Sequence, residues 1–216
     1  ALFISHHHLD HLGGTAEQRS HTFSLSHGPV DFPPIPVYSP LPLTPSSFNS
    51  NPASEVRVST GPMQLAPGVY GTGSIPRALY IMGYTEEQAL AINVEGKGLV
   101  LIIGCGHQTV QRVIERAQVL FNLPIYGIIG GLHFPVHGGR IMAGPINLQA
   151  IVGSDRMPWN YINEKDVHDA IHAIKESGAR LVSLSAHDSS DWAIGQFKDA
   201  FGPHYRELFV GETITV

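Results

Sequence analysis

The sequence predicts an α/β protein, and three observations lead to this prediction. Short runs of apolar residues have the length of buried strands. Stretches with apolar residues at helical spacing lie between the later runs. Histidines follow the strand-like runs closely, at the point where each run stops. The predicted strands include 2–4, 99–103, 123–129 and 181–185, and the predicted helices include 109–122, 163–177 and 191–201.

The first strand-like run, 2–4, ends in a dense group of metal-ligand residues. His6, His8, Asp10 and His11 place three imidazoles and a carboxylate within six residues, with no cysteine among them. Nitrogen and oxygen ligands favour borderline or harder divalent metals over soft-metal chemistry. Side chains at i and i+2 of an extended chain point the same way, so His6 and His8 can share one ion. Asp10 and His11 then face a second position.

Two simpler interpretations of this group were weighed. A run of histidines near a terminus can be a purification tag, but a tag is unbroken and this run is interrupted by Leu9 and Asp10. A single buried histidine is common in a protein core. Several such residues beside an aspartate are harder to explain in that way, because each buried imidazole needs its own partner. Metal binding is the remaining interpretation.

Composition limits the classes of function. The chain has 216 residues, a net charge of −5 and 14% charged residues, which suits one domain over 1–216. It has no cluster of lysine and arginine, which argues against a nucleic-acid partner. The longest apolar runs are too short to cross a bilayer, so no membrane partner is expected. One cysteine allows no disulfide within the chain, and the compartment stays open with the cytoplasm slightly favoured.

Two long irregular stretches are predicted to be walls of a substrate cleft. Seven prolines fall within 29–45, which predicts neither a helix nor a central strand there. A surface linker is the alternative for this stretch. The stretch 140–161 shows no periodicity and is predicted to be a second apolar wall. Apolar anchors are expected in and just after the first stretch at Phe32, Tyr38, Leu41, Leu43 and Phe48.

Shorter elements are predicted from local signals. Thr15 is expected to cap a short helix, and Asn163 to cap the helix 163–177. The segment 95–98 is predicted to be the turn of a hairpin that leads into the strand 99–103. The glycine-rich segment 71–77 is expected to be a bend, and 205–216 a terminal strand. His168 and His172 have the spacing to bind an ion, but they are as easily explained as exposed residues.

Three strand ends carry further candidates. His107 follows Gly104 and Cys105 at the end of the run 99–103, where it could be a metal ligand, a helix cap or a surface residue. Cys105 is interpreted as a small buried residue, with a metal-contacting thiolate as the alternative. His133 follows the next run, and His187 follows the last one.

These stretches resemble the metallo-β-lactamase fold superfamily. The segment 5–14 matches its HxHxDH signature, and the stretches 104–107, 130–133 and 186–188 match later motifs in the same order. The nearest resemblance is to the branch of metallo-hydrolases and dihydropterin-type synthases. The chain departs from that branch at His7, where glycine is usual, and at Asp188, which follows His187 where the branch has cysteine.

The resemblance implies a four-layer αββα sandwich and a site for two divalent ions. His6, His8 and His107 would hold one ion, and Asp10, His11 and His187 would hold the other. Zinc is expected, with manganese or iron as alternatives. Asp10 is assigned a catalytic role, and Asp188 is a candidate bridging carboxylate. His133 is assigned to donate a hydrogen bond to the substrate, and a further metal contact is its alternative.

The expected activity follows from two such ions. They would provide a metal-bound hydroxide at neutral pH, which would attack a small-molecule ester, lactone, amide or phosphoester. A pterin-type synthase or transferase is one alternative function. A metal-binding subunit without turnover is another.

The resemblance also predicts a partner. Members of the superfamily usually carry several strands before HxHxDH, and these strands supply half of the first sheet. The N-terminal part of that sheet is therefore expected to be absent from this chain. An uncovered sheet edge invites association, so a second chain or protomer is expected to complete the sheet.

Overall fold

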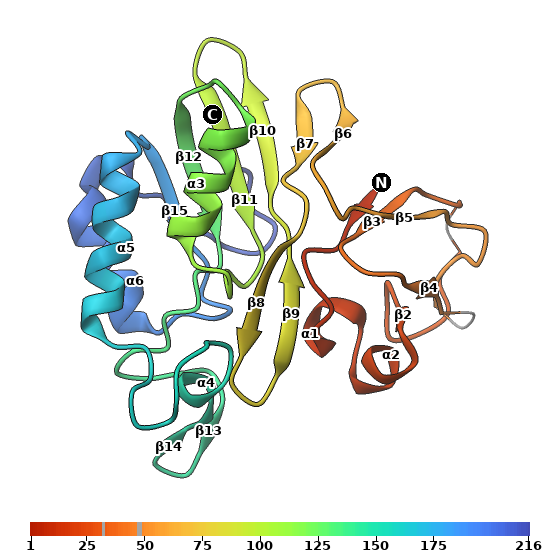
Figure 1. The fold of residues 1–216 in the computed structure, drawn as a ribbon, viewed down its shortest axis with the longest axis horizontal. Helices are drawn as coiled ribbons and strands as arrows, with labels where there is room; N and C mark the ends of the chain where they lie inside the picture. Colours follow the sequence, from red (N-terminus) through yellow and green to blue (C-terminus); the bar gives the residue numbers. More distant parts are fainter. Residues whose placement is uncertain (32, 47–48) are drawn as a thin grey trace.

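The computed structural model describes residues 1–31, 33–46 and 49–216 and shows a mixed α/β protein, as predicted. The described part of the chain contains one six-stranded sheet, one three-stranded sheet and three two-stranded sheets. Figure 1 shows the larger sheet with its helices on one side of the molecule and the three-stranded sheet on the other.

The six-stranded sheet has the order β15-β12-β11-β10-β7-β6. Its first three strands are parallel, and the remaining pairs are antiparallel. The predicted hairpin is confirmed, because β10 and β11 pair across the turn at 95–97. The bounds are β6 Met63–Ala66, β7 Val69–Gly71, β10 Leu90–Val94, β11 Gly98–Ile103, β12 Ile125–Gly130 and β15 Leu181–Leu184.

Three amphipathic helices build the main core against this sheet. They are α3 Val110–Leu120, α5 Glu164–Glu176 and α6 Asp191–Phe201. The cap predicted at Asn163 is confirmed, because its side chain and that of Asp166 form a capping box. Apolar residues of the helices pack on buried residues of the strands, among them Leu101, Val113, Ile128, Val167 and Phe197. The carboxyl ends of the parallel strands are therefore supported by a large hydrophobic core.

The three parallel strands end at one level. Ile103 of β11 pairs with Gly130 of β12, and Gly130 pairs with Leu184 of β15. The carboxyl ends of neighbouring parallel strands meet at the same edge of a sheet, where α/β proteins place their binding sites. The segments that carry His107, His133 and His187 begin at this edge.

The three-stranded sheet corrects one prediction. It consists of β1 Leu2–Phe3, β3 Val37–Ser39 and β5 Val56–Val58, with β3 in the centre. The proline-rich stretch thus contains a central strand, contrary to the prediction, because Pro36 and Pro40 flank β3 and leave its own N–H groups free to pair. A small separate core supports this sheet, formed by Ile4, Leu12, Phe23, Val37 and Leu43.

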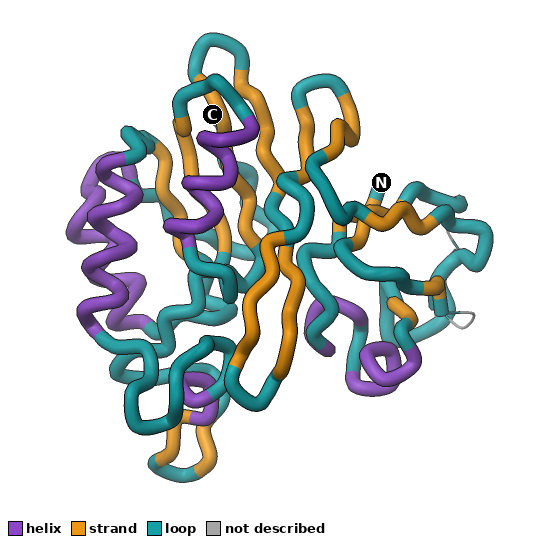
Figure 2. Tube along the Cα trace, in the orientation of Figure 1, coloured by secondary structure: helices purple, strands orange, loops and turns teal. Residues whose placement is uncertain are grey.

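Short elements connect the two sheets, and Figure 2 shows how much of this region is loop. The hairpin of β8 Ile75–Leu79 and β9 Gly83–Glu87 runs between them (Figure 1). A strand therefore begins inside the predicted bend 71–77. The other elements are α1 Leu9–Leu12, α2 Thr15–Ser20, β2 Thr22–Phe23, β4 Thr44–Pro45, β13 Met142–Ala143, β14 Ile146–Asn147, α4 Leu148–Ile151 and the 3₁₀ helix η1 Gly202–His204.

Two further predictions are wrong. Gly14, not Thr15, is the N-cap of α2, and no side chain caps that helix. The segment 205–216 forms no strand, and an isolated bridge between Tyr205 and Val182 is its pairing with the sheet.

The four-layer arrangement, the absent N-terminal strands and the partner stay predictions. In the described residues, no helix combines the length and the apolar character needed to cross a membrane.

Candidate metal centre

The opening segment passes from β1 directly into the metal-ligand residues. Gln88 holds the backbone on this path, because its N–H donates to the Ser5 carbonyl and its side-chain amide donates to the Ile4 carbonyl, both at 2.9 Å. His6 and His8 are buried, and their ring centroids lie 4.4 Å apart. His8 is the N-cap of α1, so Asp10 and His11 fall in that short helix. The local sequence therefore brings the predicted residues together.

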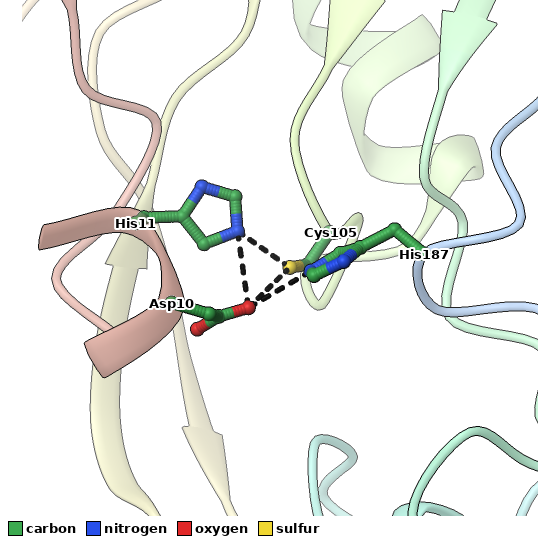
Figure 3. Close-up of side chains that lie close together, drawn as sticks. All are labelled: Asp10, His11, Cys105 and His187. Atoms are coloured by element: carbon green, nitrogen blue, oxygen red, sulfur yellow. Dashed lines mark hydrogen bonds and ion pairs between the residues drawn. The ribbon is translucent and has the colours of Figure 1, made fainter. Parts of the chain in front are cut away.

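The first group of candidate ligands consists of Asp10, His11, Cys105 and His187. One ligand atom from each lies within 4.8 Å of the others. His187 Nε2 donates to Asp10 Oδ2 at 2.8 Å, and His11 Nε2 lies 3.5 Å from the same oxygen. Figure 3 shows these side chains converging from α1, from the segment after β11 and from the segment after β15. The structure thus assembles the predicted set Asp10, His11 and His187.

Cys105 is an addition to that set. Its Sγ lies 2.9 Å from His11 Nε2 and 4.0 Å from Asp10 Oδ2. Burial raises the pKa of this thiol well above its ordinary value, and the neighbouring carboxylates raise it further. A cation would favour the thiolate instead, because metal coordination deprotonates a thiol. The sequence indicated this role only as the alternative, since a buried cysteine by itself points to packing.

The second group consists of His6, Cys105 and His107. His6 Nδ1 lies 2.9 Å from the Ser5 hydroxyl, whereas its Nε2 finds no hydrogen-bond partner among the described residues. A buried nitrogen without a partner is costly unless something occupies it. His8, predicted to belong here, lies outside the three groups of candidate ligands that the described residues form, although its Nδ1 is 3.2 Å from His107 Nε2.

Backbone carbonyls orient two of the imidazoles. His107 Nδ1 donates to the Gly153 carbonyl and His133 Nε2 donates to the Val152 carbonyl, each at 2.9 Å. A carbonyl accepts only, so these two nitrogens carry the protons. His107 Nε2 and His133 Nδ1 therefore hold the lone pairs. The stretch 140–161 supplies these carbonyls, which no sequence pattern predicts because any residue can offer a backbone oxygen.

A buried carboxylate supports the segment that carries Cys105 and His107. Glu87 is 1% exposed and accepts hydrogen bonds at 2.9 Å from the backbone N–H groups of Gly106 and His107. Burial raises the pKa of Glu87 to about 8, although the hydrogen bonds from Gly106 and His107 act in the opposite direction. This support could not be predicted from the sequence, because Glu87 ends β9 whereas its partners Gly106 and His107 follow β11.

The imidazoles of the site are held in the neutral form that metals bind. Burial is the main cause that lowers the pKa of His6, His8 and His107, and for His8 the value falls to about 4. Asp10 behaves differently. Burial opposes its ionisation, but the hydrogen bond from His187 and the charge of His11 outweigh burial and lower its pKa to about 2. The same bond raises the pKa of His187.

A cavity of about 370 Å³ opens onto both groups. Its lining includes Asp10, Cys105, His107, His133 and His187. The stretch 140–161 borders this cavity, as predicted, through Arg140, Ile141, Gln149, Val152 and Gly153. Only Ile141 and Val152 of these are large apolar residues, so the apolar character expected of this wall is not confirmed.

The predicted wall at 29–45 is wrong for its described residues, none of which is in the lining. Tyr38 and Leu43 are buried, and Leu43 packs in the small core. Phe32 and Phe48 lie outside the described residues.

One comparison with known proteins finds a similar structure. The crystal structure of Tm1679, a metal-dependent hydrolase of the β-lactamase superfamily, matches with a TM-score of 0.51 and 16% sequence identity. The match covers 76% of this chain and 59% of that chain, so this chain spans about three fifths of its length. This likeness shows the fold. No family model and no curated protein sequence matches the chain.

This chain therefore shares the fold of that structure, and the superfamily stays a prediction. The comparison does not reach the finer predictions, which are the branch, the pterin-type synthase and the subunit without turnover. The ligand roles of the individual residues also stay predictions.

Proposed function

We propose that this chain is a hydrolase that holds two divalent metal ions and acts on a small ester, lactone, amide or phosphoester. The observation that supports this most directly is that two groups of candidate ligands share Cys105 at the floor of one cavity. Asp10, His11, Cys105 and His187 would hold one ion. His6 and His107 would hold the other, with Cys105 between them and His8 beside His107.

The donor set favours zinc. It combines imidazoles, one carboxylate and one thiol, and thiolate ligands select zinc over manganese. His6 Nε2, a buried nitrogen without a partner among the described residues, fits a ligand role. Two bound ions would lower the pKa of a water toward neutrality and polarise the oxygen of the scissile group.

Asp10 is proposed to position the attacking water and to carry its proton. With a pKa lowered to about 2, the carboxylate is ionised at neutral pH and can accept a hydrogen bond from that water, while the bound ions would make the proton easier to release. In the reaction the water oxygen bonds to the carbonyl carbon or phosphorus, and the bond to the leaving group breaks. The proton passes through Asp10 to the leaving group, and the water oxygen stays with the acyl or phosphoryl product.

The cavity fits a small substrate with an apolar part. Leu9, Met82 and Ile141 line it and are 47%, 36% and 54% exposed, so they offer apolar surface at its mouth. Arg140 lines it as well, and its guanidinium is held by the carbonyls of Ala186 and Ser189. These side chains would bind the parts of a substrate that do not react.

The test is to count metals and to measure turnover. The purified chain is stripped with a chelator, reloaded with zinc and assayed on p-nitrophenyl esters, lactones and bis-p-nitrophenyl phosphate. We expect two zinc ions per chain and hydrolysis that depends on them. A chain that holds two ions and hydrolyses none of these compounds would contradict the proposed reaction.

The variant Asp10→Ala tests the catalytic assignment. Its turnover is expected to fall by about 10²- to 10⁴-fold, the range for loss of a proton-transferring group. Asp199→Ala, at an exposed carboxylate in α6, is the matched control and should retain full turnover. Unchanged turnover in Asp10→Ala would show that another group moves the proton.

A further inference from the structure

A third group of candidate ligands lies beside the two already described. It consists of His107, His133 and Asp188, with one ligand atom from each within 4.8 Å of the others. All three side chains are buried, with exposed fractions of 5%, 4% and 6%. All three also line the cavity, so an ion could reach them from solvent.

The hydrogen bonds of this group leave a lone pair on each member. His107 and His133 donate their ring protons to the Gly153 and Val152 carbonyls, which leaves lone pairs on His133 Nδ1 and on His107 Nε2, the latter 3.2 Å from His8 Nδ1. His133 Nδ1 has no partner among the described residues. The predicted hydrogen bond from His133 to a substrate is not available in this arrangement, because the N–H of His133 donates to the Val152 carbonyl.

Asp188 adds a negative charge with an unused acceptor. Its Oδ1 accepts a hydrogen bond from Gln149 Nε2 at 3.2 Å and lies 3.8 Å from His187 Nε2. Its Oδ2 is buried and has no partner among the residues that the structure describes. A buried carboxylate oxygen left unpaired is costly, and a cation is the natural compensation.

The backbone around the group is held in unusual conformations. His133 has a φ of +54°, in the left-handed region that residues other than glycine rarely adopt. Gly153 approaches so closely that a Cβ there would lie 2.4 Å from His133 Cε1 and 3.0 Å from His107 Cε1. Such strain persists where the surrounding structure demands it, and it concentrates at functional sites.

We propose that His107, His133 and Asp188 form a third metal-binding position. This proposal rests on the proposed function, because it shares His107 with the second ion. An imidazole nitrogen binds one ion at a time, so this position and the His6–Cys105–His107 position are occupied alternately. Two histidines and one carboxylate are a common zinc-binding set in catalytic sites. The second ion thus has two places to bind, one with the thiol and one without it.

The experiment counts zinc in variants of the complete chain. Metal-free protein is loaded with zinc, passed through a desalting column and analysed by plasma mass spectrometry. His6→Asn removes the His6–Cys105–His107 position, and we expect this variant to retain two ions per chain because the second ion moves to His133 and Asp188. The double variant His6→Asn with Asp188→Asn should hold one. The matched control His6→Asn with Asp199→Asn should hold two.

Cobalt provides a second readout on the same variants. The second cobalt equivalent added to His6→Asn should produce d–d absorption without additional thiolate-to-cobalt charge transfer, because the third position contains no sulfur. A melting curve checks that each variant folds, and His6→Ala replaces His6→Asn if the latter does not fold.

Two outcomes would overturn the inference alone. One is a count of two in the unsubstituted chain that falls to one in folded His6→Asn. The other is a double variant that still holds two ions. A count below two in the unsubstituted chain would overturn the two-ion proposal and this inference together.

Discussion

Two regions supply the candidate ligands, and they differ in how firmly the fold supports them. His107, His133 and His187 follow β11, β12 and β15, whose residues contribute to the main core together with α3, α5 and α6. His6, His8, Asp10 and His11 follow a two-residue strand and enter a four-residue helix above a much smaller core. The candidate metal centre thus joins a region with a large core to one with a small core, and bound ions would hold the two together.

Metal removal should separate the two regions most strongly. At a free zinc concentration about a thousand times the dissociation constant, a bound ion stabilises the folded state by about 4 kcal/mol. We expect chelation to increase amide hydrogen exchange far more in α1 and α2 than in β11 and β12. Hydrogen exchange followed by mass spectrometry measures this difference. Equal increases in both regions would show that the opening segment does not depend on the ions.

Acid should destabilise the metal-free protein, because the buried histidines of the site are neutral in the folded state and protonated in the unfolded chain. The pKa values of His6, His8 and His107 are lowered in the folded state, to about 4 for His8, so the unfolded chain binds more protons below pH 6.5. Their contribution to stability is fully present above pH 6.5 and is lost as the pH falls through the folded values.

The buried carboxyl of Glu87 affects stability in the opposite direction. Its pKa is raised to about 8 in the folded state, so its contribution is largest at low pH and is lost as the pH rises from about 4.5 through 8. The pKa is lowered for six histidines (His6, His7, His8, His11, His107 and His133) and raised for Glu87 and His187, so the unfolded chain binds more protons below pH 6.5. Denaturant unfolding at pH 6.5, 5.5 and 4.5 should therefore show a drop of at least about 1.4 kcal/mol per pH unit, the value of one net proton. A flat profile would contradict the neutral, buried histidines.

Gly153→Ala should disturb His107 and His133, which lie in the region supported by the main core. Its Cβ would lie 2.4 Å from His133 Cε1, and the residue has a φ of +85°. We expect about 10- to 100-fold weaker zinc binding, the usual effect of displacing the groups that orient a ligand. Zinc competition with a chromogenic chelator measures this change. Gly144→Ala is the matched control, because Gly144 also has a positive φ, +59°, but a Cβ there meets nothing within 4 Å.

His168→Ala should have the smallest effect. His168 is exposed on α5 and lies outside the groups of candidate ligands that the described residues form. We expect unchanged zinc content and a stability change within about 0.5 kcal/mol. Loss of an ion in this variant would show that a different set of histidines binds the metal.

The sequence by itself determined those features that neighbouring residues encode. The segment from His6 to His11 predicts metal binding because its candidate ligands lie within six consecutive residues. The apolar strands with amphipathic helices between them predict the fold class. The histidines after the parallel strands could be expected at one edge of the sheet, because parallel strands end at the same side.

Only the tertiary structure decided which groups complete the site. Cys105 meets His11 across 94 positions of sequence, Glu87 supports Gly106 and His107 from another strand, and the carbonyls of Val152 and Gly153 orient two imidazoles. Proximity of this kind depends on packing between distant segments, and a backbone carbonyl leaves no mark in the sequence. Packing between distant segments also explains why β3 was not predicted. Its place in the centre of a sheet depends on pairing with β1 and β5, which lie on either side of the proline-rich stretch in the sequence.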